Sequence, residues 1–274
     1  KKATATNFSS NMSLSEDNVA KINDYHFNIA NGEVNGKINY DLKTFSGNAE
    51  MTIKNADAQI IGENFFDLPG QMYGHVTGDM HLSCNGLSSV ECVNTLSGGG
   101  SFEVRDGRMP KLGSLEYLLK AGNLITGGIT GLSINGIIDL ITPLKTGNFD
   151  KISGEVKVEN GIASDINVYS SGKDLNMYMT GNYNLSTFVA DMEVYGSLSK
   201  NFSTLLGKIG NSSLNRLFNT IPGININDIN PSSTSKINKI PNFEKANVLR
   251  VFKAEIFGDI NGSNYVKSFR WIKN

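Results

Sequence analysis

The sequence has little of what enzymatic and metal sites are built from. Its 274 residues include three histidines, two cysteines and one tryptophan. His75 and His81 lie six residues apart, which along a strand separates them by about 20 Å, too far to share a metal ion. No cysteine and histidine spacing typical of zinc is present. We therefore predict no catalytic residue, no metal ligand and no cofactor, and we expect a protein that is not an enzyme.

Other absences exclude further classes. The glycine run Gly98–Gly100 lacks the strand and helix context of a nucleotide-binding loop, and no Gly-x-Ser-x-Gly nucleophile motif occurs. The 25 Lys and Arg residues and 26 Asp and Glu residues are scattered, so no basic surface for nucleic acid is expected. No run of about 18 apolar residues occurs, which excludes a transmembrane helix within the chain. Because the chain begins with Lys1-Lys2 and not with Met, we expect it to be a piece of a longer protein from which a targeting or anchoring segment has been removed.

What the sequence does contain is alternation. From Tyr25 onward, apolar and polar residues alternate over about ten segments, which is the period of half-buried strands. Turn signals at Asn31-Gly32 and Asn160-Gly161, and the short link at Lys43-Thr44, predict antiparallel pairing. One stretch differs: after a strand and an Asp106-Gly107 turn, leucines recur at helical spacing and predict a helix over Leu112–Lys120.

The same pattern divides the chain into four parts. Residues 1–24 form a polar lead-in, with a short helix expected near Asp17–Ile22. Residues 25–222 form the main β domain, and residues 223–242 form a polar loop. Residues 243–274 are expected to form a terminal β-hairpin packed on the same sheet.

The apolar faces of so many strands must be buried somewhere. The sheet can close on itself as a sandwich or barrel, face lipid as a membrane barrel, or curl into a trough that holds an apolar guest. Small residues such as Gly36, Gly47 and Gly78 favour the trough, because they leave room, and methionine adapts to irregular partners. The same glycines and methionines also suit bends and ordinary core gaps. The expected fold is mainly β: a long curved antiparallel sheet forming an open hydrophobic groove, with a few short helices capping or flanking it.

The residues predicted to line this groove share the apolar parity of their strands. They are Val34, Ile38, Tyr40, Phe45, Met51, Ile53, Val76, Met80, Leu82, Phe102, Val156, Val158, Met177, Met179, Met192 and Val194. The helix expected to cap the groove presents Leu112, Leu115, Leu118 and Leu119. Cys84 and Cys92 either form a disulfide, which would suit an oxidising compartment, or are two small buried thiols.

Two segments resemble the C-terminal region of the AsmA-like family. The first is LSGGGSFEVRDGRMPKLGSLEYLL, and the second is FDKISGEVKVENGIASDINVYSSGKDLNMYMTGNYNLSTFVADMEVYG. The second carries a hairpin with an Asn160-Gly161 turn and, further on, the turn Leu185-Ser186-Thr187. Together the resemblance covers about residues 65–198.

The resemblance implies a periplasmic location and an anchor in the bacterial inner membrane through a segment missing from this chain. It also implies a non-enzymatic lipid-binding or lipid-transfer module that shelters phospholipid acyl chains and supports outer-membrane assembly or lipid homeostasis. The expected partners are phospholipid or another acyl-chain lipid and cell-envelope proteins, and no nucleic acid. The alternative is a scaffold β-domain of an envelope complex, with a self-filled core and no lipid cargo.

Overall fold

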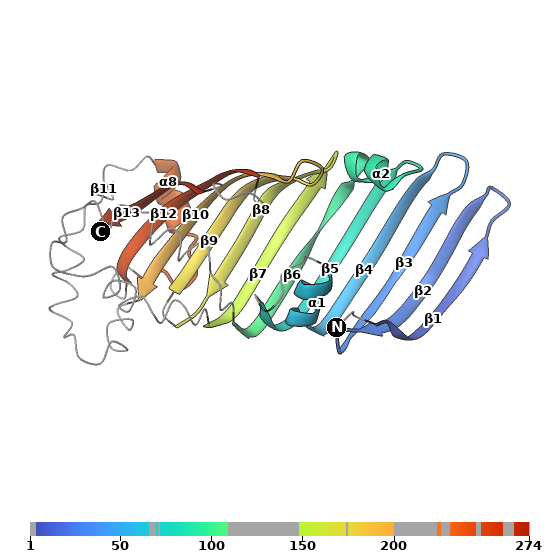
Figure 1. Cartoon of the computed structure of the whole chain (residues 1–274), viewed down its shortest axis with the longest axis horizontal. Helices are drawn as coiled ribbons and strands as arrows, with labels where there is room; N and C mark the ends of the chain where they lie inside the picture. The colour runs from blue at the N-terminus through green and yellow to red at the C-terminus, as the bar shows by residue number, and fades with distance from the viewer. Residues whose placement is uncertain are drawn as a thin grey trace. The chain divides into compact units, whose positions relative to one another are not determined.

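The computed structural model describes residues 4–65, 70, 72–108, 148–173, 175–199, 224–225, 231–244, 248–259 and 266–273. The described chain is mainly β and forms one open sheet in the order β1-β2-β3-β4-β5-β6-β7-β8-β9-β10-β12-β13-β11 (Figure 1). This confirms the predicted class. The first six strands are β1 (Thr6–Leu14), β2 (Val19–Ile29), β3 (Gly32–Asp41), β4 (Ser46–Asp57), β5 (Tyr73–Asn85) and β6 (Ser97–Arg108).

The remaining strands lie after the predicted capping helix, which falls outside the described residues. They are β7 (Asn148–Glu159), β8 (Ile162–Ser171), β9 (Leu175–Asn184), β10 (Val189–Ser199), β11 (Ile224–Asn225), β12 (Val248–Asp259) and β13 (Val266–Lys273). Strands β12 and β13 pair antiparallel as the terminal hairpin, and β11 pairs parallel to β13. The described helices are α1 (Ala58–Phe65), α2 (Ser89–Thr95) and α8 (Pro231–Ile237).

The chain divides into two compact units. Unit 1 comprises residues 1–107, 153–167 and 181–190, and unit 2 comprises residues 108–152, 168–180 and 191–274. Each unit is described below by itself.

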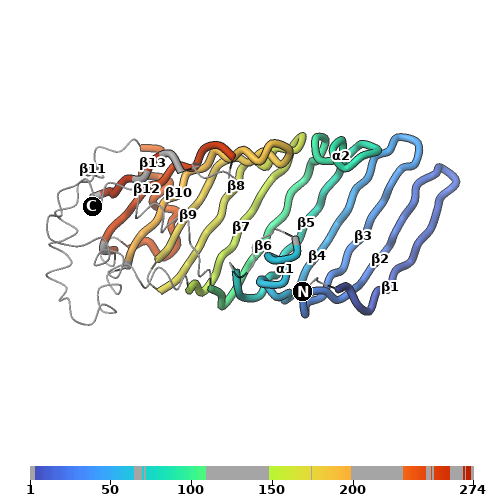
Figure 2. Tube along the Cα trace, viewed as in Figure 1, coloured from blue at the N-terminus to red at the C-terminus, as the bar shows by residue number. Residues whose placement is uncertain are grey.

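Register in unit 1 places apolar residues opposite apolar residues. Across β3 and β4, Val34 faces Ile53 and Ile38 faces Ala49, while across β4 and β5 Met51 faces Met80. The other face pairs polar residues, as between Lys37 of β3 and Glu50 of β4. Figure 2 shows strands β2 to β5 running side by side. Because side chains alternate along a strand, the register fixes one apolar and one polar face over these strands.

The predicted lead-in over residues 1–24 is wrong where it is described, because Thr6–Leu14 form β1 and Val19–Asp24 begin β2. The expected helix over Asp17–Ile22 is also wrong: Ser15–Asn18 is a turn, and Ala20 and Ile22 pair with Tyr40 and Ile38. The sequence hides this because Asp24 has a positive φ of 52°, and the register shifts between Ile22 and Tyr25. This bulge moves the apolar positions from even to odd numbers within one strand.

Of three turns predicted from the sequence, one is found where expected, one is shifted by one residue and one is not a turn. Asn160 and Gly161 both have positive φ, as a two-residue hairpin turn requires. The β2–β3 turn is shifted by one residue from the prediction, because Ala30 and Asn31 hold the positive φ values while Gly32 already pairs with Ile29. Asp106-Gly107 is not a turn. Only Asp106 has positive φ, and β6 continues to Arg108, so the pair lies within the strand.

The β3–β4 and β9–β10 turns share one design. The sequences Asn39–Phe45 and Asn182–Phe188 read NYDLKTF and NYNLSTF. In each, the side chain that opens the turn accepts two backbone N–H groups: Asp41 from Lys43 and Thr44, Asn184 from Ser186 and Thr187. The Thr44 and Lys43 N–H groups lower the pKa of Asp41.

The core of unit 2 lies under helix α8. Ile237 and Ile240 pack with Tyr178, Tyr195 and strand residues Val248, Val251 and Ile272. The predicted polar loop over residues 223–242 is therefore wrong where it is described. Its Ser- and Asn-rich composition conceals two isoleucines, three residues apart, that reach one face of the sheet.

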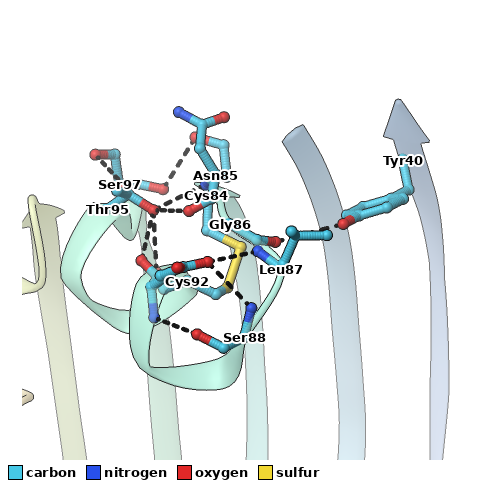
Figure 3. The surroundings of a disulfide bond; sticks show 11 residues. Tyr40, Cys84, Asn85, Gly86, Leu87, Ser88, Cys92, Thr95 and Ser97 are labelled. Atoms are coloured by element: carbon cyan, nitrogen blue, oxygen red, sulfur yellow. Dashed lines mark hydrogen bonds between the residues drawn. A yellow bond between two sulfur atoms is a disulfide. The ribbon is translucent and has the colours of Figure 1, made fainter. Parts of the chain in front are cut away.

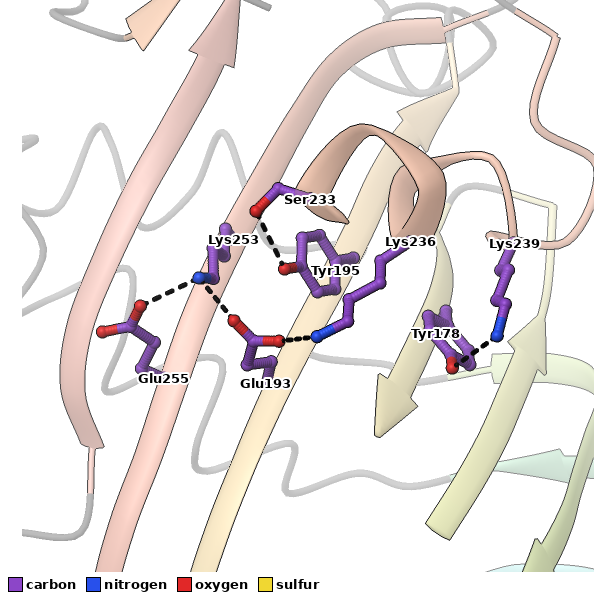
Figure 4. A network of polar contacts seen from close by, with 8 residues as sticks. All are labelled: Tyr178, Glu193, Tyr195, Ser233, Lys236, Lys239, Lys253 and Glu255. Carbon is purple, nitrogen blue, oxygen red and sulfur yellow. Dashed lines mark hydrogen bonds and ion pairs between the residues drawn. The ribbon is translucent and has the colours of Figure 1, made fainter. Parts of the chain in front are cut away.

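A polar network borders this core (Figure 4). Glu193 accepts from Lys236 of α8 and from Lys253 of β12, the latter at 2.6 Å, and Lys253 also pairs with Glu255 at 2.9 Å. Tyr195 donates to Ser233 of α8 at 3.4 Å. The network connects α8 to strands β10 and β12. These strands contribute Tyr195, Val248 and Val251 to the core that α8 covers.

We expect this network to weaken in acid. Burial disfavours the charged form of Glu193, but hydrogen bonds from Lys236 and Lys253 outweigh it and lower the pKa of Glu193. The carboxylate therefore stabilises the fold above the ordinary glutamate pKa, and this contribution is lost as pH falls through the lowered value. Glu193→Gln should cost about 1–2 kcal/mol at pH 7, and the difference from the parent chain should shrink towards pH 3. Urea unfolding at both pH values measures it, with exposed Glu155→Gln as the control.

A second prediction concerns Gly36. A Cβ there would lie 2.1 Å from the Glu50 carbonyl oxygen and 2.4 Å from the Tyr25 hydroxyl. A larger side chain would displace the β4 backbone or the Tyr25 ring and break the hydrogen bond between Tyr25 and the Glu50 carbonyl. Gly36→Val should therefore reduce the free energy of unfolding by about 2 kcal/mol or more. Urea denaturation of this variant should contrast with the exposed neighbour Lys37→Val, which should change little. Equal stability of the two variants would contradict the packing described.

Candidate functional site

The candidate site is the apolar face of strands β1–β6 in unit 1, here called the apolar face. Paired register places eight of the predicted lining residues on it. They are Val34, Ile38, Tyr40, Met51, Ile53, Val76, Met80 and Leu82. Phe102 of β6 belongs beside Gly78, since a Cβ on Gly78 would lie 3.3 Å from the Phe102 Cβ.

This face is only partly covered. Tyr25, Val34 and Ala56 are buried, whereas Ile38, Met51, Ile53 and Leu82 are half-buried. Met80 and Phe102 are exposed. Apolar side chains aligned over several strands and left in contact with water are unusual for a finished core, and they mark surfaces that bind something apolar.

A hollow of about 400 Å³ lies at one end of this face. It is formed by the end of β1, the start of β2 and the end of β3, and its lining is mostly apolar. The residues are Met12, Ser13, Leu14, Ala20, Lys21, Ile22, Ile38, Tyr40 and Leu42. The volume lies within the range of small-molecule sites.

Of the nine residues that line the hollow, only Ile38 and Tyr40 were in the predicted set. Met12, Leu14, Ala20 and Ile22 lie within the segment interpreted as a polar lead-in. Alternation of Met12 and Leu14 with Asn11 and Ser13 was the available signal. It was weak because, apart from Phe8, the rest of β1 is made of small polar residues.

The sequence suggested that glycines on the apolar face leave room for a guest. The structure shows that Gly36 and Gly47 do not. The Tyr25 ring lies over Gly36, and its hydroxyl donates to the Glu50 carbonyl of β4 at 3.2 Å. The Tyr40 ring similarly lies 2.9 Å from where a Gly47 Cβ would be. An aromatic ring from the adjacent strand fills the space beside Gly36 and Gly47, whereas a Cβ on Gly78 would lie 2.7 Å from the Ser101 carbonyl oxygen of β6. The hollow is lined instead by residues of β1, β2 and β3 and by Leu42.

The remaining predicted residues lie elsewhere. Phe45 is not on the sheet: it ends the β3–β4 turn with a φ of 55° and is exposed. Val156 and Val158 are on β7 of unit 1, half-buried and buried. In unit 2, Met177, Met179, Met192 and Val194 are half-buried, and their strand neighbours Tyr178 and Tyr195 fill the core under α8 instead. Leu112, Leu115, Leu118 and Leu119 lie outside the described residues.

Polar chemistry is sparse on the described part of the chain. His26, on the polar face of β2, hydrogen bonds through Nδ1 to Asn35 at 2.8 Å. His81 lies opposite Glu50 and His75 opposite Asp57. Among the described residues, no group of three or more His, Cys, Asp or Glu side chains could hold a metal ion. Nor does any helix in those ranges have the length and apolar character needed to cross a membrane.

Cys84 and Cys92 are joined by a disulfide, with Cα atoms 5.0 Å apart (Figure 3). The bond fastens helix α2 to the end of β5. Ser88 caps α2 and accepts from Glu91 N–H, while the Glu91 carboxylate accepts from Leu87 and Ser88 N–H groups. Thr95 Oγ closes the far end by donating to the Asn85 carbonyl at 2.6 Å and accepting from its N–H at 2.8 Å.

Comparisons with known proteins add no assignment to this geometry. No family model matches the chain, and neither a curated protein nor a solved structure matches it.

Loss of the disulfide should loosen the α2 segment. The bond closes a loop with a sequence separation of eight residues, for which chain entropy gives about 2–3 kcal/mol. The double variant Cys84→Ser, Cys92→Ser should lose that much stability, and the Asn85 and Gly86 amides should exchange hydrogen faster. The reduced parent chain should behave the same way. Unchanged exchange at both amides would show that the hydrogen bonds alone hold the segment.

Proposed function

We propose that the chain is a non-enzymatic lipid-binding module that shelters acyl chains on the apolar face of unit 1. The observation that carries this proposal is the hollow between β1, β2 and β3, with half-buried and exposed apolar side chains continuing beyond it over β4–β6. Covering that surface with an acyl chain would remove apolar area from water at about 25 cal/mol per Å². The polar contacts available there are few, so little head-group selectivity is expected.

The setting we propose is the periplasmic side of a bacterial envelope, within a longer AsmA-like protein held to the inner membrane and involved in outer-membrane lipid supply. The motif resemblance supports this setting. The Cys84–Cys92 disulfide also supports it, because such bonds persist in oxidising compartments. Other envelope proteins would then be its partners.

Unit 2 favours a second candidate, a scaffold domain that carries no lipid. Its core is filled by its own side chains, with Tyr178, Tyr195, Ile237 and Val251 each almost fully buried. The two candidates differ in what unit 1 does with its apolar face, which a binding experiment can decide.

The experiment is native mass spectrometry with lipid extraction on the full chain. The parent chain should retain phospholipid or take up a fluorescent acyl lipid delivered from cyclodextrin. Ile38→Asp should reduce uptake at least about tenfold, since a carboxylate facing an acyl chain loses its hydration. Asn39→Asp places the same charge one residue away on the polar face and should retain uptake.

Folding is checked by circular dichroism. If Ile38→Asp unfolds, the exposed Met12→Ser replaces it and should also weaken uptake. A folded parent chain that takes up no lipid would overturn the proposal and favour the scaffold role.

A further inference from the structure

The turns at one end of the unit 1 strands form a continuous ordered rim. In an antiparallel meander, the β1–β2, β3–β4, β5–β6, β7–β8 and β9–β10 connections fall at the same end, where Figure 1 shows helix α2. We call this the loop rim and define it as residues 14–18, 42–45, 86–96, 160–162 and 185–189.

Neighbouring turns of the rim are hydrogen bonded to each other through the backbone. Leu42 N–H donates to the Asn18 carbonyl at 3.0 Å, and Gly86 N–H donates to the Phe45 carbonyl at 2.9 Å. Beyond α2, Gly161 N–H donates to the Leu96 carbonyl at 2.9 Å. Leu185 N–H then donates to the Gly161 carbonyl at 3.0 Å. These bonds, with the disulfide and the capping box of α2, hold the tips of the rim in fixed positions.

This fixed rim nevertheless presents large apolar side chains to solvent. Leu87 is 73 % exposed and Val90 is 66 % exposed, both on the disulfide-held α2 segment. Every other turn of the rim contributes at least one more exposed apolar residue. These are Leu14, Leu42, Phe45, Ile162, Phe188 and Val189.

The opposite end of the strands is different. Its described connections in unit 1, Ala30-Asn31 and residues 58–64 between β4 and β5, carry no exposed large hydrophobic residue. Connections that carry exposed apolar residues at one end of the unit 1 strands indicate a surface that meets an apolar medium.

We propose that the loop rim docks on the interface of a lipid bilayer. One turn occurs for every two strands, so neighbouring turns of the loop rim lie about 10 Å apart. Each turn exposes one or two large apolar side chains. A bilayer interface accepts apolar side chains at any lateral spacing, whereas a protein partner would need a matching pocket for each. Leu14 and Leu42 belong to both the rim and the lining of the hollow, so a lipid leaving the bilayer would enter the hollow directly. This last step rests on the proposed lipid-binding function.

The charge of the rim indicates which bilayer it suits. Its residues include three carboxylates, Glu16, Asp17 and Glu91, and one ammonium, Lys43. The Glu91 carboxylate is already held by the α2 cap. Protein surfaces that bind anionic lipid are rich in Lys and Arg. The loop rim is not, so its binding to a bilayer should not require anionic lipid.

Flotation of the full chain with phosphatidylcholine vesicles tests the proposal. The parent chain should float with the vesicles, and the variant Leu87→Ser, Val90→Ser should bind at least about tenfold more weakly, because two apolar side chains no longer leave water. The matched control is Phe257→Ser, which removes a 53 % exposed phenylalanine of unit 2 outside the rim. This control should bind as well as the parent chain.

Lipid uptake from cyclodextrin separates this proposal from the proposed function. The rim variant should still take up lipid without vesicles, so loss of vesicle binding with retained uptake supports docking alone. A parent chain that floats but takes up no lipid leaves docking supported and overturns the lipid-binding function. Failure of the parent chain to float, equal loss in Phe257→Ser, or binding only to anionic vesicles would overturn docking. Capture of a partner protein by the rim without vesicle binding would overturn it too.

Discussion

The structure depends on how the apolar face of an antiparallel sheet is kept from water. The register aligns apolar residues across strands, and such a face is costly unless something covers it. In unit 2, Ile237 at the end of helix α8 and Ile240 in the turn that follows cover the face, which becomes a core. In the described part of unit 1, tyrosines lean over glycines at Gly36 and Gly47 and cover only part of the face. The same sheet architecture thus yields a filled core in one unit and an open surface in the other.

The strands were predictable because their period is two, and this period was visible from Tyr25 onward. The start of the sheet was not, because the Asp24 bulge shifts the apolar positions from even to odd numbers. Such a bulge requires only one residue that tolerates positive φ. Asp106 shows a related ambiguity, since an Asp-Gly pair fits both a hairpin turn and, as here, a strand that continues through it. Local sequence does not decide between the two, whereas pairing with the adjacent strand does.

The candidate site was predictable in part for the same reason. Val34, Ile38 and Met51 follow from parity alone. The hollow could not be predicted from parity. It depends on β1, which has few apolar residues, and on where β1, β2 and β3 end relative to one another. The role of α8 was hidden because helix packing depends on two isoleucines within an otherwise polar segment. Glycines on the apolar face suggested free space, but adjacent tyrosines take it up, and only three-dimensional neighbours reveal this.

The shared turn of Asn39–Phe45 and Asn182–Phe188 has a consequence for how such a sheet varies in size. Each copy closes one hairpin by an Asp or Asn side chain that accepts two backbone N–H groups within the turn itself. Adding or removing such a hairpin would leave the parity of the strands on either side unchanged, and only the backbone bonds of Leu42, Phe45 and Leu185 to neighbouring turns would have to form anew. The width of the apolar face would then change in steps of two strands, about 10 Å each. Insertions of a single strand would reverse the direction of every later strand and move its turns to the opposite end.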